Sequence, residues 1–185
     1  MKRFYLFLCI ALLGSVHAFG KVKPIDTEHS SFTIHVGKSG LFSVAGHDHE
    51  VVAPIAEGVV DDSEPGHVWL RIEAAKLTVL PEQDQAEVQS AMQSQVLESK
   101  RFPEIRFAST SIAKVGDGKW ASTGNLTLHG QTKVITVQVQ RENEGYTGRT
   151  RIKQTQFGIQ PVSAAGGAIK VKDELQIEFF IVAKE

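Results

Sequence analysis

The fold of this chain is decided by residues 124–140, which read GNLTLHGQTKVITVQVQ. Apolar side chains alternate with polar ones on both arms of this stretch, and the apolar members are Leu126, Leu128, Ile135, Val137 and Val139. Successive side chains of a strand point to opposite faces, so each arm has one apolar face. His129-Gly130 separates the arms, and glycine adopts the positive φ that a tight hairpin turn requires. The stretch predicts an antiparallel hairpin with one apolar face.

The same alternation recurs along the chain. It predicts a first strand that ends at Gly37, a strand at 51–62 bent by Pro54, a strand at 67–77 and a last strand at 175–183. In total it predicts about eight strands, the number at which a closed barrel just encloses one slender ligand. Closure also removes the exposed edges that a sheet must otherwise protect. We therefore predict an all-β fold, an antiparallel eight-stranded barrel.

One segment has helical spacing, from about residue 82 to residue 99. Pro81 stands at its start, and its apolar stripe consists of Val88, Ala91, Met92, Gln95 and Val96. Phe102-Pro103 ends the pattern. A helix of this kind can lie across a barrel opening and help to line a cavity.

The amino terminus has the layout of a secretory signal peptide. Lys2 and Arg3 precede an apolar run, and small residues follow up to Ala18. We expect residues 1–18 to be removed and residues 21–185 to form one domain, periplasmic or secreted. Removal takes away Cys9, the single cysteine, and changes the formal charge from −1 to −3. This charge argues against nucleic acid as a partner.

A metal site is the alternative suggested by Gly46-His47-Asp48-His49-Glu50. In an extended backbone His47 and His49 project to the same side, a spacing that can chelate a transition metal. A two-histidine pair lacks the three or four ligands of a complete site, and polar residues at a strand end explain it equally well. A periplasmic metal-binding protein or metalloenzyme centred on these histidines is thus the second hypothesis.

Four stretches in order resemble the YceI-like family of exported, lipocalin-like barrels. They are Ile25-Asp26 with His29-Ser30-Ser31, then Phe102–Phe107, then Gly124–Gly130, and finally Phe157-Gly158-Ile159. The resemblance implies a lipocalin-like barrel of eight strands with the helix near its mouth. It also implies a long apolar cavity for a polyisoprenoid or a similar amphiphile, such as a quinone tail or a fatty amide.

The chain departs from the usual pattern of that family at two places. Relatives carry an Arg-Asp pair and a His-Leu step before the Phe-Pro, where residues 83–88 here read QDQAEV. The His47-Asp48-His49 run is the second departure. Both departures fall where we expect the barrel mouth. The head group of the ligand is therefore the feature that can least be inferred for this chain from the family.

The primary hypothesis is an exported carrier or store that holds an apolar lipid in the barrel. The candidate lining residues, chosen by alternation, are Phe32, Ile34, Phe42, Leu70, Ile72, Val88, Met92, Phe107, Leu126, Leu128, Val137 and Phe179. For each of them an ordinary core position is the competing interpretation, and a slip of one residue would move a whole strand's set to the other face.

We expect no catalytic residues, no enzyme activity and no cofactor apart from the lipid. A homodimer and a transient contact with a membrane or a membrane protein stay open as partners. A third hypothesis is an interaction module that docks a membrane-bound partner through a strand edge or the Trp69 face; such a module would have an exposed apolar patch and no cavity.

Overall fold

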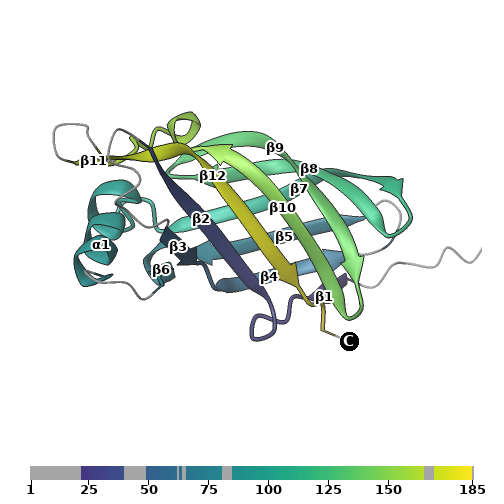
Figure 1. The fold of residues 1–185 in the computed structure, drawn as a ribbon. Helices are drawn as coiled ribbons and strands as arrows, with labels where there is room; N and C mark the ends of the chain where they lie inside the picture. The colour runs from purple at the N-terminus through teal and green to yellow at the C-terminus, as the bar shows by residue number, and fades with distance from the viewer. Residues whose placement is uncertain are drawn as a thin grey trace, which may run out of the picture.

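Figure 1 shows the computed structural model of the chain, an antiparallel sheet that curls around a central space with a helix at one end. The structure describes residues 22–39, 49–61, 63, 66–80, 85–164 and 169–184. The expected signal peptide, residues 1–18, lies outside these ranges and stays a prediction. No helix among the described residues is long and apolar enough to cross a membrane.

The sheet contains twelve strands in the described part of the chain. They are β1 (Val22–Pro24), β2 (Ser31–Ser39), β3 (His49–Val52), β4 (Ile55–Asp61), β5 (His67–Glu73), β6 (Thr78–Val79), β7 (Glu104–Gly116), β8 (Lys119–Leu128), β9 (Gln131–Glu142), β10 (Gly145–Lys153), β11 (Ser163–Ala164) and β12 (Ile169–Ile181). The helical segments are α1 (Gln85–Ala91), a π-helical turn (Met92–Val96) and two 3₁₀ turns (Ala74–Lys76 and Gln154–Phe157).

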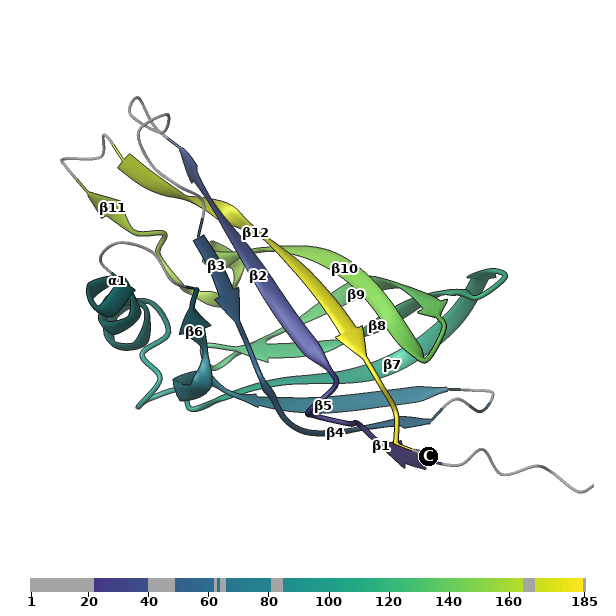
Figure 2. The same cartoon turned by 60° about the horizontal axis from the view of Figure 1, so that its bottom comes forward.

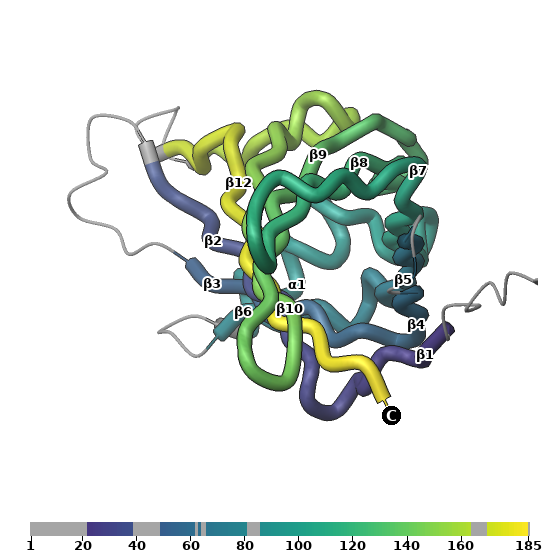
Figure 3. The backbone as a smooth tube through the Cα atoms, turned by 90° about the vertical axis from the view of Figure 1, so that its right-hand side faces the viewer, coloured from purple at the N-terminus to yellow at the C-terminus, as the bar shows by residue number. Residues whose placement is uncertain are grey.

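The strands form a closed circuit because β3 and β4 are two parts of one bent run. β3 pairs with β2, β4 pairs with β5, and Ala53-Pro54 lies between them. The circuit continues through β7, β8, β9 and β10 to β12, which pairs again with β2. Viewed along this wall, the backbone forms a ring (Figure 3). The predicted all-β, lipocalin-like barrel is confirmed.

The predicted number of strands is lower than the number observed. Proline cannot donate a ladder hydrogen bond, so Pro54 divides one predicted strand into β3 and β4. The short strands β1, β6 and β11 supply the other additions. With the bent run counted once, the wall itself has the eight strand positions that alternation predicts.

The hairpin at residues 124–140 is confirmed in strand, face and turn. β8 pairs with β9 from Lys119 opposite Gln140 to Leu128 opposite Gln131. His129 and Gly130 have φ values of 51° and 69°, the pair of positive values that a two-residue type I′ turn requires.

The predicted helix is present, with different geometry and bounds. α1 ends at Ala91, and Met92–Val96 continue as a π-helical turn in which the Leu97 amide donates to the Met92 carbonyl at 2.8 Å. The helical segment ends before Glu98, whose φ of 43° reverses the chain, so the predicted end at residue 99 is too late. Gln95 is exposed, contrary to its predicted place in the apolar stripe.

The barrel has two different ends, which Figures 1 and 2 show in agreement. The helix end comprises residues 85–99, the β8–β9 turn and residues 154–159. The hairpin end comprises the β4–β5, β7–β8 and β9–β10 connections, of which the structure describes residues 61, 63, 66–67, 116–119 and 142–145.

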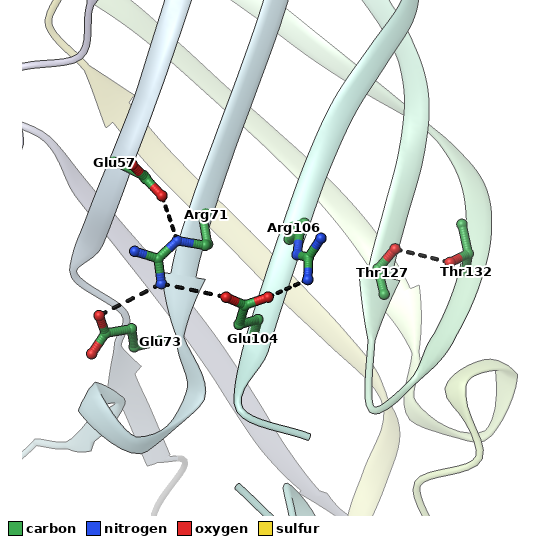
Figure 4. Close-up of polar contacts among 7 residues, drawn as sticks. All are labelled: Glu57, Arg71, Glu73, Glu104, Arg106, Thr127 and Thr132. Carbon is green, nitrogen blue, oxygen red and sulfur yellow. Dashed lines mark hydrogen bonds and ion pairs between the residues drawn. The ribbon is translucent and has the colours of Figure 1, made fainter. Parts of the chain in front are cut away.

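The outer wall is polar and carries a chain of ion pairs (Figure 4). Arg71 on β5 lies between Glu57 of β4, at 2.6 Å, and Glu104 of β7, at 3.7 Å. Glu104 also contacts Arg106, and the Glu57 carboxylate raises the pKa of Arg71. Leu70 and Ile72, which alternate with Arg71, are 4% and 5% exposed on the inner side. The alternation read in the sequence therefore separates a charged outside from an apolar inside.

Candidate functional site

The inner wall surrounds a cavity of about 1150 Å³ that extends from α1 to the hairpin end. This volume exceeds the roughly 300–1,000 Å³ of ordinary small-molecule pockets. Apolar side chains from β2, β5, β7, β8, β9, β10 and β12 supply most of its lining. A space of this size and polarity fits a long apolar molecule better than a compact polar one.

The predicted lining residues that the structure describes all lie in the cavity wall. They are Phe32, Ile34, Leu70, Ile72, Val88, Met92, Phe107, Leu126, Leu128, Val137 and Phe179. Phe42 lies outside the described residues. The alternation thus has the correct phase on every described strand that contributes to the set, and the role of these residues as ligand contacts stays a prediction.

Two glycines explain why large aromatic side chains leave the cavity open. A Cβ atom at Gly124 would lie 2.7 Å from Phe107 Cζ, and one at Gly148 would lie 2.8 Å from Phe179 Cε1. Each phenylalanine ring therefore covers a glycine of the neighbouring strand and lies along the wall. Phe179 also stacks on Phe32 of β2, with ring centroids 5.2 Å apart. These rings form a smooth apolar surface without filling the space.

At the helix end, α1 closes part of the barrel mouth. Val88, Ala91 and Met92 face the cavity, in agreement with their predicted stripe. Two glutamines one turn apart attach the helix to the segment before it. Gln89 accepts a hydrogen bond from the Val79 amide and donates to the Leu77 carbonyl, both at 2.8 Å. Gln93 donates to the same Leu77 carbonyl at 3.1 Å.

The glutamine attachment was not predicted from the sequence. The sequence pattern that could have indicated it is the i, i+4 spacing of Gln89 and Gln93 beside the apolar stripe. Glutamine can replace a strand partner because its amide carries one donor group and one acceptor, like the backbone. Gln89 in effect extends the ladder of β6 and so fixes the helix across the opening.

Three of the stretches that carry the family resemblance meet beside this attachment. His129 Nε2 lies 2.8 Å from Glu98 Oε2, and its Nδ1 lies 3.3 Å from the carbonyl oxygen of Phe157. The Phe102 ring packs on the His129 ring with centroids 4.2 Å apart, and it would collide with a Cβ atom at Gly130. These residues connect β8–β9, the segment before β7 and the Gln154–Phe157 turn, so their role is structural.

The hairpin end of the cavity carries several polar groups. Asp61, Ser63 and His67 belong to the lining, together with Trp120, Ser122 and Tyr146. Hydrogen bonds from Ser63 hold the pKa of Asp61 below its usual value. His67 Nδ1 lies 3.2 Å from Ser109 Oγ, which accepts a hydrogen bond from the Val68 amide. Asp61, His67 and Ser109 are therefore held by bonds within the barrel wall.

Of the two histidines in the metal-site hypothesis, the structure describes only one. His49 lies in the cavity wall at the start of β3, whereas His47 is outside the described residues. Within the described ranges, no three His, Cys, Asp or Glu side chains come together as a metal site would require. The third hypothesis predicted a barrel without a cavity, and the cavity argues against it.

Comparison with protein families matches residues 24–183 to the YceI-like domain. The chain belongs to the YceI-like family. Its curated relatives include a UPF0312 protein of Shewanella oneidensis, 29% identical over 149 residues that cover 74% of this chain and 75% of that protein. A UPF0312 protein of Shewanella putrefaciens is 27% identical over 164 residues, which cover 82% of this chain and 83% of the relative.

Solved structures share the fold of this family member. BcnA of Burkholderia cenocepacia has a TM-score of 0.63 at 21% identity, and the match covers 86% of this chain and 99% of BcnA. A polyisoprenoid binding domain of Saccharophagus degradans has a TM-score of 0.64 at 14% identity, with 89% and 99% covered. The barrel architecture is therefore common to proteins with very different sequences.

Proposed function

We propose that this chain is an exported carrier or store that holds a long apolar lipid, of the polyisoprenoid, quinone or fatty-amide type, inside the barrel. The observation that carries this proposal is the cavity of about 1150 Å³ and its predominantly apolar wall. The polyisoprenoid binding domain with the same fold supports the class of ligand. The signal-peptide layout of residues 1–18 supports a periplasmic or secreted location.

Burial of the lipid chain supplies the driving force for binding. Each methylene that leaves water contributes ~0.8 kcal/mol, so ten methylenes contribute about 8 kcal/mol before the cost of ordering the chain. Micromolar affinity corresponds to about 8 kcal/mol. A chain somewhat longer than ten carbons therefore reaches micromolar binding without a charged anchor, and the protein needs no cofactor besides the lipid.

Native mass spectrometry of the mature protein from its own periplasm tests the proposal. We expect an apolar molecule of several hundred daltons to co-purify at about one per chain or per pair of chains, and organic extraction to identify it. A bare polypeptide mass would contradict the carrier function. A mass excess that matches a transition metal and disappears with His47→Ala/His49→Ala would favour the metal hypothesis instead.

A matched pair of variants on β9 locates the ligand. Val137 faces the cavity and is 7% exposed, whereas the next residue, Gln138, is exposed on the outer face. Val137→Phe should reduce the co-purifying lipid about tenfold, because an obstructing ring costs ~1–3 kcal/mol. Gln138→Phe should leave it unchanged. Equal lipid content in the two variants would place the ligand outside the barrel.

A further inference from the structure

Ser122 on β8 is a polar residue whose side chain finds no hydrogen-bond partner in the described part of the chain. Its side chain lies in the cavity wall and is 3% exposed. Ser122 Oγ is fully buried and has no hydrogen-bond partner among the described residues. A buried hydroxyl without a partner lowers stability, so such a group calls for an explanation.

Two other polar side chains of the wall, Thr150 and Gln154, are satisfied within the chain. Thr150 Oγ1 donates to the Thr136 carbonyl at 3.2 Å, and Gln154 Nε2 donates to the Lys172 carbonyl at 2.9 Å. The residues opposite Ser122 on the adjacent strands are Ile112 of β7 and Val137 of β9. Both are apolar and offer no side-chain hydrogen bond, and Ser122 itself is one of the residues that line the cavity.

Two aromatic side chains lie between Ser122 and the hairpin end. Trp120 occupies the same face of β8 two residues earlier, and the Tyr146 ring of β10 lies 6.0 Å from it, edge-on. Lys114, a cation of this half of the cavity, lies 3.5 Å from Asp117. Asp61 contributes an acidic group to the same half. The surroundings thus suit a neutral polar group better than a phosphate or a carboxylate, whose desolvation is far more costly.

We infer that Ser122 Oγ hydrogen-bonds an uncharged oxygen, a hydroxyl or a carbonyl, in the head of the bound lipid. This inference rests on the proposed function. It adds the chemical class of the lipid's head group and the orientation of the lipid in the barrel. The head lies in the hairpin half, and the apolar chain runs toward α1 past Leu126 and Leu128. The six residue-to-residue steps from Ser122 to Leu128 span ~20 Å of strand, which is room for a long chain.

Binding of three related probes to the delipidated mature protein tests the inference. The probes are a C20 isoprenoid alcohol, the hydrocarbon with the same chain, and the diphosphate of the alcohol, each measured by competition with a fluorescent lipid. We expect the wild type to bind the alcohol about tenfold more tightly than the hydrocarbon, as one buried hydrogen bond allows. Ser122→Ala should remove this preference and leave the affinity for the hydrocarbon unchanged.

The control variant is Ser111→Ala, because Ser111 is an exposed serine on the neighbouring strand β7; it should keep the preference. Without ligand, Ser122→Ala should raise the melting temperature, whereas the loss of a structural serine would lower it. A preference retained in Ser122→Ala, or a diphosphate that binds more tightly than the alcohol, would overturn the inference. If the wild type bound none of the probes, the proposed function itself would fail.

Discussion

The helix end and the hairpin half of the barrel differ in the partners of three polar side chains, Gln89, His129 and Ser122. At the helix end, Gln89 and His129 bond to groups of the same chain and hold the mouth together. In the hairpin half, Ser122 lies in the cavity wall, and its buried hydroxyl has no hydrogen-bond partner among the described residues. A buried polar group stabilises a fold only when its partner is present. On the function that we propose, the helix end is scaffold, and a ligand completes the hydrogen bonding in the hairpin half.

Replacing His129 by alanine should have the largest effect on the scaffold side of this comparison. The His129 side chain is 12% exposed. Its ring contacts Glu98 and Phe157 and packs on Phe102. We expect His129→Ala to lower the free energy of unfolding by about 3 kcal/mol, since it removes a charge-assisted hydrogen bond and a packed ring. Urea unfolding measures this loss through the midpoint at constant m.

Two control variants distinguish the stability that the His129 hydrogen bonds contribute from the stability that the backbone conformation of the turn contributes. Asparagine tolerates the positive φ of residue 129 but is too short to reach Glu98 and Phe157. His129→Asn should therefore recover only a small part of the stability. His29→Ala, at a histidine that is 71% exposed, should change stability by less than about 0.5 kcal/mol. Similar losses of stability in His129→Ala and His29→Ala would mean that the contacts of His129 do not hold the helix end together.

A smaller loss is expected where α1 is attached to β6. Gln89→Ala removes the side-chain acceptor of the Val79 amide and one of the two glutamine donors to the Leu77 carbonyl, which keeps its hydrogen bond from Gln93. Because both residues are buried, at 1% and 6% exposure, the cost should be about 1–2 kcal/mol. Hydrogen exchange should show faster exchange of the Val79 amide, while amides in the centre of β8 keep their protection.

The control for the attachment is Gln95→Ala on the same helical segment. Gln95 is exposed, so its removal should leave exchange at Val79 unchanged. Unchanged exchange in Gln89→Ala would mean that packing of Val88 and Met92, rather than the glutamine, holds the helix over the cavity.

The alternation of apolar and polar residues was sufficient to predict the barrel wall. A strand has a period of two, so Leu126, Leu128 and Val137 could be assigned to one face before any partner strand was known. His129-Gly130 carried its turn chemistry in the two residues themselves. These features are local, and for that reason a single sequence contains them.

What the sequence did not predict depends on partners distant along the chain. Gln89 bonds to residues ten and twelve positions earlier, and His129 bonds to Glu98 and Phe157, which are 31 and 28 residues away. Ser122 is one of several serines that occur in strands, and only the closed barrel shows that its hydroxyl lacks a partner. The π-helical turn was likewise absent from the helical pattern.

The smallest predicted effect concerns the pH dependence of the helix end. Asp173 of β12 accepts hydrogen bonds from the Thr155 amide at 2.9 Å and the Thr155 hydroxyl at 2.8 Å, and these bonds lower its pKa. Because the folded pKa lies below the unfolded value of ~3.9, this carboxylate stabilises the fold above about pH 5. The contribution disappears as the pH falls through the folded pKa.

Asp173→Asn should therefore be less stable than the wild type at pH 6, and the difference should shrink progressively at pH 4 and pH 3, as the pH falls through and below the unfolded pKa of ~3.9. Urea midpoints of the two proteins at these pH values measure it. The matched control is Asp117→Asn in the β7–β8 turn, where the fully exposed side chain lies 3.5 Å from Lys114 in an ion pair that solvent screens. The difference in stability between Asp173→Asn and the wild type could instead stay constant with pH. In that case the asparagine disturbs packing, and the charge of the Asp173 carboxylate adds nothing to its bonds with Thr155. The expected convergence would instead show that the Thr155–Asp173 bonds of the helix end stabilise the fold only while the Asp173 carboxylate is charged.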